Sequence, residues 1–263
     1  MATEIHATAV IEPGAVLGDG CRIGPYCVVG AHVQIGAGTR LHSHVVIDGY
    51  TKLGDHCEVF SFACLGKQTQ DLKYKGGISY VEIGNGTTLR EYVTVHAATT
   101  AGNKTVIGDR CHILAYCHIA HECQLGNGII MSNCTHLAGH VTVEDSVVFG
   151  GMGGVHQFVR IGKMSMIGAT GKVVQDIVPF SLADGAPAVP VTINKVGMQR
   201  NGRSEETISA VTRAFKVLFR SNLTVEAALA QLEAEFAGVP EVADMVRFAR
   251  ASERGLARPK ATE

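Results

Sequence analysis

Apolar side chains recur at every sixth position over most of the chain. In the frame that starts at Ile5 and ends at Val173, 26 of 29 positions carry Leu, Ile, Val, Met or Phe. Glycine often follows the apolar residue directly, and a small or β-branched residue stands four places after the apolar residue. An α-helix needs a spacing near 3.6 residues and disfavours this much glycine. The pattern therefore predicts short strands joined by tight turns.

Three of these hexads make one triangular coil of the chain, so that residues 18 apart lie one above the other. Stacked coils bury a continuous ladder of aliphatic side chains, and we expect about nine coils at a strand spacing of roughly 4.8 Å. The predicted fold is a β-solenoid over residues 1–178. Six of the eight cysteines occupy the small interior position and are predicted to be free, buried thiols, namely Cys21, Cys27, Cys57, Cys111, Cys117 and Cys123.

Helical spacing replaces the hexads near the C-terminus. Residues 179–203 contain three prolines and little periodicity, and we interpret them as a transition segment. Ser204, Thr224 and Pro240 each precede an apolar stripe of helical period, which predicts three helices. Residues 204–263 are therefore expected to form a small helical domain.

Two segments interrupt the hexads. The first covers residues 67–80 and the second residues 97–104, where Asp71, Gly77 and Ala101 replace the expected core side chains. Loops that leave a rigid scaffold often carry function, but tolerated insertions would look the same. The sequence leaves both interpretations open.

The charge and the N-terminal sequence limit the classes of function. With 23 basic and 24 acidic residues, the chain has no overall charge that would attract nucleic acid or an anionic membrane. Residues 1–6 do not resemble a secretory signal, and no apolar stretch approaches the roughly 20 residues of a membrane span. We expect a soluble, cytoplasmic protein without membrane insertion or nucleic acid binding.

Several of the twelve histidines share one edge of the predicted coils. Steps of 18 residues from His121 lead to Gly139 and then to Gln157, with His140 and His156 beside them. Imidazole titrates near neutral pH and suits general base catalysis, while a glycine one coil away leaves a backbone N–H for an oxyanion. The register indicates a catalytic groove, although surface histidines would give the same residue types.

Four segments of the chain resemble the acyl-[acyl-carrier-protein]–UDP-N-acetylglucosamine O-acyltransferase family, and the resemblance covers essentially the whole chain. They are Gln70-Asp71-Leu72-Lys73-Tyr74, His118-Ile119-Ala120-His121, Leu137-Ala138-Gly139-His140-Val141, and Gly150-Gly151-Met152 together with His156-Gln157-Phe158. The resemblance implies a left-handed parallel β-helix with a C-terminal helical domain. It also implies transfer of a (R)-3-hydroxyacyl chain from acyl carrier protein to UDP-N-acetylglucosamine, the first step of lipid A biosynthesis. The expected assembly is a homotrimer with sites between subunits, without a cofactor beyond the phosphopantetheine of the carrier and without a metal.

The resemblance also implies roles for individual residues. His121 matches the general base, and the backbone N–H of Gly139 matches the oxyanion donor. Ala169 stands at the position that measures acyl length, and its small side chain predicts room for a longer chain than methionine would allow. The residues that match substrate contacts are Gln70, Asp71, Lys73, His96, His118, His140, His156, Gln157, Asn194 and Arg200.

Three positions depart from the family pattern. Glu122 follows the matched base where Asp is usual, so the carboxylate is retained on a longer side chain. Val196 and Asn201 stand where Glu and Arg are common, which leaves the contacts to uridine open.

Three alternatives remain at this point. A γ-type carbonic anhydrase would hold zinc through histidines such as His118 and His121, or His136 and His140, but its H-x4-H spacing is absent. A scaffold subunit without catalysis would need the repeat alone. Within the family, some members acylate a 3-amino sugar nucleotide and form an amide, and the sequence does not distinguish the two nucleophiles.

Overall fold

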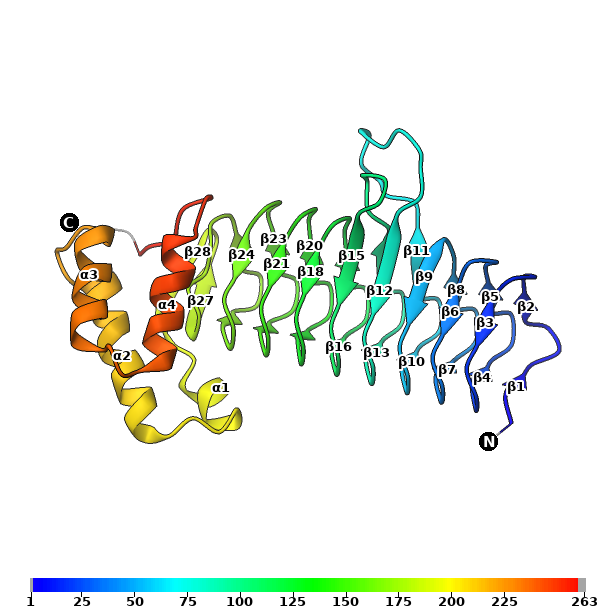
Figure 1. Ribbon diagram of the computed structural model, residues 1–263, viewed down its shortest axis with the longest axis horizontal. Helices are drawn as coiled ribbons and strands as arrows, with labels where there is room; N and C mark the ends of the chain where they lie inside the picture. Colours follow the sequence, from blue (N-terminus) through cyan, green and yellow to red (C-terminus); the bar gives the residue numbers. More distant parts are fainter. Residues whose placement is uncertain (1, 260–263) are drawn as a thin grey trace.

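The computed structural model describes residues 2–259. Most of the chain winds into a long three-sided prism, and the C-terminal helices lie together at one end of it (Figure 1). Residue 1 and residues 260–263, which the predicted domain ranges include, lie outside the described residues. Within residues 2–259, none of the helices has the length and apolar character needed to cross a membrane.

Three sheets, one on each side of the prism, are made of very short strands. The first sheet contains β1 (Glu4–Ile5), β4 (Arg22–Ile23), β7 (Arg40–Leu41), β10 (Glu58–Val59), β13 (Thr88–Leu89), β16 (His112–Ile113), β19 (Ile130–Met131), β22 (Val148–Phe149), β25 (Met166–Ile167), β27 (Ser181–Gly185) and β28 (Ala188–Ile193). The second sheet contains β2 (Val10–Ile11), β5 (Val28–Val29), β8 (Val46–Ile47), β11 (Cys64–Lys67), β14 (Thr94–His96), β17 (His118–Ile119), β20 (His136–Leu137), β23 (Gly154–Val155) and β26 (Lys172–Val173). The third sheet contains β3 (Val16–Leu17), β6 (Gln34–Ile35), β9 (Tyr50–Leu53), β12 (Tyr80–Ile83), β15 (Lys104–Ile107), β18 (Gln124–Leu125), β21 (Thr142–Val143) and β24 (Arg160–Ile161).

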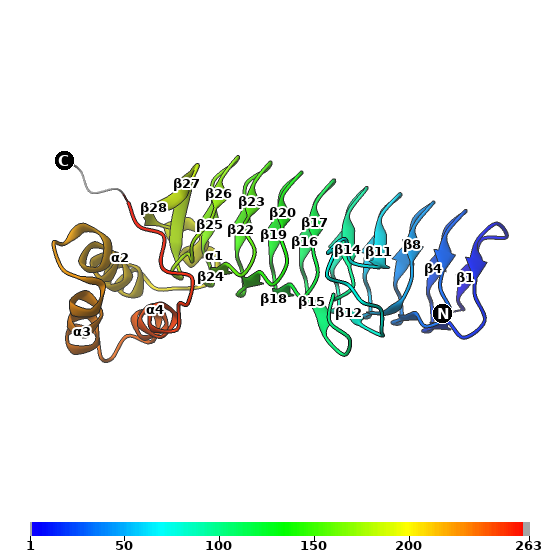
Figure 2. The ribbon, with the colours of Figure 1, turned by 90° about the horizontal axis from the view of Figure 1, so that it is seen from above.

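Each strand from β1 to β23 pairs in parallel with the strand that comes three places later in the chain, as the hexad period predicts (Figure 2). His118 and Ile119 pair with His136 and Leu137, one coil of 18 residues later. The three edges of the prism are named here by the sheets that they join. Edge 1–2 includes residues 114–117, edge 2–3 includes residues 120–123, and edge 3–1 includes residues 126–129.

The interior of the prism is a ladder of aliphatic side chains. Ile119, Leu137 and Val173, from three coils of the second sheet, are fully buried. Each such side chain contributes about 1.5–3 kcal/mol on leaving water. The six cysteines predicted to lie inside are free and buried, and burial raises the pKa of the Cys117 thiol to about 11 and that of Cys123 to about 12. They are therefore packing residues that stay protonated.

The two predicted interruptions are loops that project from the same side of the prism (Figure 1). They explain why Tyr80 pairs with Tyr50 and Lys104, which are 30 and 24 residues away instead of 18. The extra lengths are both multiples of six residues, and for this reason the apolar frame is the same on both sides of each loop. Asp71, Gly77 and Ala101, which break the frame, all lie in these loops.

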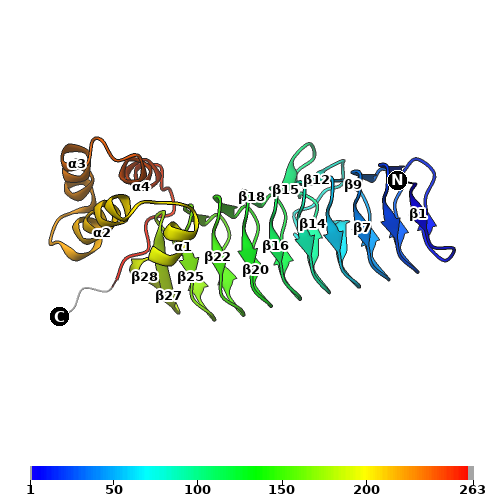
Figure 3. The same ribbon diagram turned by 90° about the horizontal axis from the view of Figure 1, so that it is seen from below.

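The C-terminal part contains α1 (Lys195–Arg200), α2 (Glu205–Arg220), α3 (Val225–Glu235) and α4 (Pro240–Arg250). The Ser204 side chain accepts from the Thr207 N–H and the Thr224 side chain from the Ala227 N–H, which confirms two of the three predicted helix starts. The third helix, α4, begins at Pro240. Residues 179–203 are more regular than expected. They contain β27, which extends the first sheet, the antiparallel β28 and the short helix α1, which lies beside them (Figure 3). A helix of six residues is too short to show a period in the sequence.

Candidate active site

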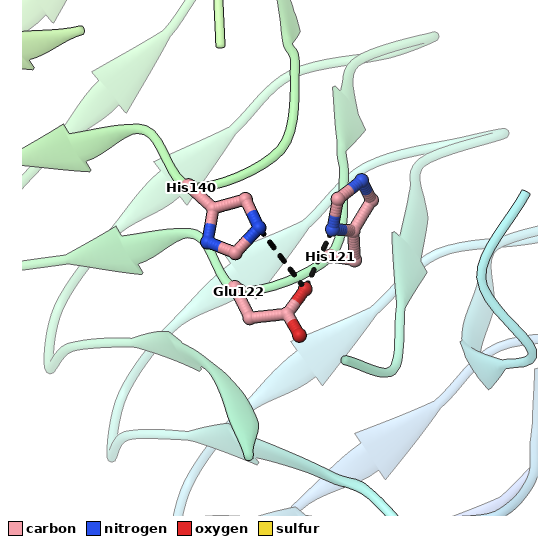
Figure 4. Close-up of side chains that lie close together, drawn as sticks. All are labelled: His121, Glu122 and His140. Atoms are coloured by element: carbon pink, nitrogen blue, oxygen red, sulfur yellow. Dashed lines mark hydrogen bonds and ion pairs between the residues drawn. The ribbon is translucent and has the colours of Figure 1, made fainter. Parts of the chain in front are cut away.

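His121 and Glu122 form a hydrogen-bonded pair on edge 2–3. Both follow β17, and His121 Nδ1 lies 2.6 Å from Glu122 Oε2 (Figure 4). A carboxylate only accepts hydrogen bonds, so the neutral imidazole carries its proton on Nδ1. The Nε2 lone pair of His121 is then free to take a proton from another molecule. This geometry provides an oriented general base.

Glu122 is itself held in place on its other side. Its Oε1 accepts a hydrogen bond of 2.9 Å from the Thr100 N–H, which belongs to the second loop, and the residue is only 7% exposed. Burial raises the pKa of Glu122, but hydrogen bonds from the Thr100 and Thr99 backbone and from His121 outweigh it and lower the pKa overall. The carboxylate is therefore charged at neutral pH. It can stabilise an imidazolium on His121 while it also anchors the loop.

Gly139 lies one coil after His121 and packs against its ring. A side chain at residue 139 would overlap the imidazole of His121, so only glycine leaves room for the ring in this position. The Gly139 carbonyl accepts from the Phe158 N–H, whereas the Gly139 N–H donates to no atom of residues 2–259. A backbone donor thus remains available beside the base, as the register predicts.

His140 adds a second imidazole next to the pair. Its ring centroid is 5.2 Å from that of His121, with the two ring planes almost perpendicular, and it stacks on Phe158 at 4.7 Å. Its Nε2 lies 3.9 Å from Glu122 Oε2. Glu122, His140 and Phe158 all have positive φ, because they occupy the same turn position in successive coils.

The two loops lie against each other and cover one side of the pair. The Ser79 hydroxyl donates to the Ala98 carbonyl at 2.7 Å, which links them. Asp71 in the first loop places Oδ2 3.9 Å from His121 Nε2. The Lys73 N–H donates to Asp71 Oδ1, and this bond and the nearby His121 lower the pKa of Asp71. Gln70 and Lys73 are exposed on the same loop.

His96 and His118 lie on the second sheet close to the pair. Burial lowers the pKa of His96, and burial together with the neighbouring histidines lowers the pKa of His118 to about 4. The two rings meet edge to face at 4.8 Å, and His118 Nδ1 is 2.8 Å from the Thr94 hydroxyl. Both rings are therefore neutral at physiological pH. They can offer hydrogen bonds to a substrate but no positive charge.

The other predicted residues lie farther from His121. His156 and Gln157 occupy edge 2–3 two coils later and are exposed. Ala169 is exposed on edge 1–2. Asn194 and Arg200 line a cavity of about 590 Å³ at edge 3–1, which none of the residues around His121 lines. One chain therefore brings together the predicted base and loop residues, but not the predicted nucleotide and acyl contacts.

The structure changes the interpretation of Asn194. Its amide nitrogen donates to the Met164 carbonyl and its oxygen accepts from the Gly197 N–H, so the side chain caps α1. Val196 and Asn201 line the same cavity, together with the outward side chains Ile130, Val148 and Met166 of the first sheet. Asn194 thus shapes the cavity through α1, and Arg110 and Arg200 are the two arginines among its lining residues.

Two interacting groups were missed by sequence reasoning. The Thr100 N–H, which holds Glu122, is a backbone donor that no side-chain pattern reveals. Arg254 places Nη2 2.9 Å from His156 Nδ1, and 98 residues of sequence separate the two. No periodicity links the C-terminal segment to edge 2–3, so the sequence contains no signal for this contact.

The donor atoms of His121, Glu122 and His140 lie within 4.8 Å of one another, so they are a possible metal set among residues 2–259. The separation of 2.6 Å between His121 and Glu122 is that of a short hydrogen bond, whereas two zinc ligands in a tetrahedral site would stand about 3.3 Å apart. The pairs considered from the sequence do not converge, since His118 bonds Thr94 and His136 bonds the Tyr116 carbonyl. The geometry favours a hydrogen-bonded base.

Known protein families resemble this chain in both its repeat region and its C-terminal part. The family model described as "Udp N-acetylglucosamine O-acyltransferase; Domain 2" matches residues 176–257, and the bacterial transferase hexapeptide model matches residues 2–37 and 104–139. The acyl-[acyl-carrier-protein]–UDP-N-acetylglucosamine O-acyltransferase of Thermodesulfovibrio yellowstonii is 47% identical over 97% of this chain and 99% of its own.

Solved structures show the same likeness over nearly the whole chain. The UDP-N-acetylglucosamine O-acyltransferase of Moraxella catarrhalis is 40% identical, with a TM-score of 0.93 over 97% of this chain and 99% of its own. The UDP-N-acetylglucosamine acyltransferase of Campylobacter jejuni is 39% identical, with a TM-score of 0.91 over 98% of this chain and 100% of its own. The chain belongs to the UDP-N-acetylglucosamine O-acyltransferase family.

Proposed function

We propose that the protein transfers a (R)-3-hydroxyacyl chain from acyl carrier protein to the 3-hydroxyl of UDP-N-acetylglucosamine, the first step of lipid A biosynthesis. The observation that carries this proposal is the His121–Glu122 pair together with the N–H of Gly139 one coil away, which donates to no atom of residues 2–259. Family membership supports the choice of substrates, and the pair supports the mechanism.

The chemistry that follows is a direct transfer. His121 Nε2 takes the proton of the sugar hydroxyl while its oxygen attacks the thioester carbonyl carbon and a C–O bond forms. The Gly139 N–H donates to the oxyanion, and the Glu122 carboxylate stabilises the charged imidazole. The C–S bond then breaks, and the departing sulfur receives the proton from His121. The products are an ester and a free thiol, and no cofactor beyond the carrier's phosphopantetheine is needed.

Eight of the ten substrate contacts proposed from the sequence lie on the edge of this base, in its loops or on the second sheet, and only Asn194 and Arg200 lie apart. Asp71 lies within 3.9 Å of His121 Nε2, so it can accept a hydrogen bond from the sugar hydroxyls. Gln70, the exposed Lys73, His140, His156 and Gln157 offer further polar groups on the same edge. His96 and His118, which are neutral, suit hydrogen bonds to the sugar rather than charge pairing with phosphate.

A homotrimer would complete the site. Arg200 and the acyl-length position Ala169 lie on edges 3–1 and 1–2, apart from His121 on edge 2–3. If the first sheet of one subunit faces the second sheet of the next, the cavity beside Arg200 comes opposite His121. Edge 1–2, which both sheets share, would then lie on the threefold axis.

An exposed column of stacked rings supports this arrangement. Tyr26, His44, Phe62, Tyr92 and Tyr116 follow one another along edge 1–2, with centroids 5.0, 5.0, 5.0 and 4.8 Å apart. The tyrosine and phenylalanine residues are 44–58% exposed, which is unfavourable for a contiguous aromatic stripe in water. A neighbouring subunit that covers the column would remove this cost.

A competition assay tests the proposed reaction. Purified protein receives UDP-N-acetylglucosamine and its 3-amino analogue together with a series of (R)-3-hydroxyacyl carrier proteins of different chain length. We expect an ester on the hydroxyl sugar as the main product, and loss of transfer in His121→Ala. An amide as the main product would establish the alternative nucleophile, and transfer retained by His121→Ala would refute the assignment of the base. The cytoplasmic location stays a prediction.

A further inference from the structure

His156 has two neighbours that demand opposite positions of its proton. Its Nδ1 lies 3.2 Å from the Gln157 carbonyl oxygen and 2.9 Å from Arg254 Nη2. A carbonyl accepts only, so the first contact requires a proton on Nδ1. A guanidinium donates only, so the second requires a lone pair there. The shorter and charge-assisted bond from Arg254 prevails, and the proton of the neutral ring then lies on Nε2.

Arg254 is fixed firmly enough to impose this choice. Its Nε donates to the Val174 carbonyl at 2.9 Å, one coil after His156. The segment around it pairs with the end of the β-helix, since the Asp176 N–H donates to the Gly255 carbonyl and the Ala257 N–H donates to the Asp176 carbonyl. The buried Asp176 carboxylate also accepts from the Ser252 hydroxyl at 2.7 Å. The guanidinium therefore spans two coils from an anchored backbone.

We propose that Arg254 is a positioning residue that holds His156 as the Nε2–H tautomer and so presents a hydrogen-bond donor to the sugar nucleotide. This rests on the proposed function, in which His156 contacts the substrate. Phosphate oxygens of the nucleotide accept hydrogen bonds and do not donate, and the opposite tautomer would offer them only a lone pair. The C-terminal segment thereby takes part in binding, although it lies outside the coil that carries the base.

The test combines a spectroscopic and a kinetic measurement on the full-length protein. Long-range 1H–15N correlation spectra of 15N-histidine-labelled protein distinguish the two tautomers, and His156→Asn assigns the signal. In Arg254→Met we expect the His156 signal to move toward the Nδ1–H form. We also expect the KM for UDP-N-acetylglucosamine to rise roughly tenfold, with kcat changed less than about threefold. Arg254→Lys, which keeps one donor, should recover part of both effects.

Controls separate this proposal from the proposed function. Arg258→Met removes an arginine four residues further along the chain that donates a hydrogen bond to the Leu218 carbonyl, and should alter neither measurement. An unchanged tautomer in Arg254→Met overturns the proposal, as does a shifted tautomer with an unchanged KM. If His156→Asn itself leaves the KM unchanged, the assignment of His156 as a substrate contact fails, whatever the spectra show. If Arg254→Met does not fold, Arg254→Gln replaces it, because glutamine is too short to reach both acceptors.

Discussion

The imidazole of His121 packs directly on the backbone of Gly139, in space that any side chain at residue 139 would fill. Gly139 does not have a positive φ, so an alanine fits its backbone conformation and only the overlap with the ring matters. We therefore expect Gly139→Ala to push His121 away from Glu122 and to lower kcat by roughly 100-fold or more, as displaced catalytic groups do. Steady-state kinetics measure the effect. Gly238→Ala, where a Cβ meets open space, is the control and should keep full activity.

Removing the charge of Glu122 should weaken the base. Glu122→Gln keeps the size of the side chain but cannot stabilise an imidazolium on His121 by charge, and we expect kcat to fall roughly 10- to 100-fold with a smaller change in KM. Glu122→Asp keeps the charge, so its kcat should fall less than that of Glu122→Gln. Some loss of kcat should remain, because the shorter side chain cannot reach both His121 and the Thr100 N–H. Equal activity of Glu122→Gln and the wild type would show that the carboxylate does not support the base.

The repeat allowed the β-helix to be predicted almost completely, for a simple physical reason. Every coil must bury one aliphatic side chain per hexad, as at Ile119 and Leu137, so the core residues can be identified from the six-residue repeat alone. The two loops could be located but not interpreted. Their contact with the base depends on the backbone N–H of Thr100 and on Asp71, which approaches His121 from 50 residues away.

The elements and contacts that the sequence did not predict have one feature in common, because none of them follows the six-residue repeat. Helix α1 and strand β28 are single elements after the last coil, and their packing is decided by tertiary contacts such as the Asn194 side chain on Met164. The same holds for Arg254 at His156, which joins two distant segments. Residues 18 apart could be matched from the sequence, whereas these partners could not.

The low pKa of His118 should make stability depend on pH. In the unfolded chain this ring takes up a proton near pH 6.5, but in the folded protein only near pH 4, because burial and the neighbouring histidines oppose the charge. Its contribution to stability is complete above about pH 6.5 and is lost as the pH falls toward 4. The loss between pH 7 and 5 is at most about 2 kcal/mol, and less where solvent screens the ring.

Urea unfolding at fixed protein concentration checks this expectation. His118→Asn keeps a partner for Thr94 without a titrating group, so its stability should fall less than that of the wild type between pH 7 and 5. His56→Asn, at an exposed position with a left-handed backbone that asparagine tolerates, is the control and should follow the wild type. Parallel curves for His118→Asn and the wild type would contradict the prediction.

The aromatic column on edge 1–2 predicts how the subunits assemble. Tyr92→Glu places a charge between Phe62 and Tyr116, and burial of that charge against a neighbour would cost several kcal/mol. Sedimentation analysis should show a trimer for the wild type and monomers for this variant, together with loss of transfer. Gln34→Glu adds the same charge on the third sheet, which would face solvent, and should leave the trimer intact. A trimer that survives Tyr92→Glu would place the interface elsewhere.

Ala169 should set the length of the acyl chain. Its small side chain is exposed on edge 1–2, and a methionine there would extend into the space that the end of the chain is expected to occupy. Ala169→Met should therefore prefer a shorter (R)-3-hydroxyacyl donor than the wild type, with the kcat/KM ratio between the two donors shifted roughly tenfold or more. A panel of acyl carrier proteins measures the shift. An unchanged donor preference would remove this role from residue 169.

Each coil advances the chain along the long axis of the prism by one strand spacing, roughly 4.8 Å. Equivalent positions of different coils are therefore separated by whole multiples of this spacing, called divisions here. His121 stands at one division, Gly139 at the next and His156 two divisions above His121, and the cavity beside Arg200 is lined by residues of these same coils, from Arg110 to Met166. A coil added or lost before the first loop would leave these intervals unchanged. A coil added between His121 and Arg200 would preserve the fold but move Arg200 and α1 away from His121 by a whole division. The number of coils is thus free to vary at the N-terminal end. Between His121 and Arg200 it is fixed by the length of the proposed substrates.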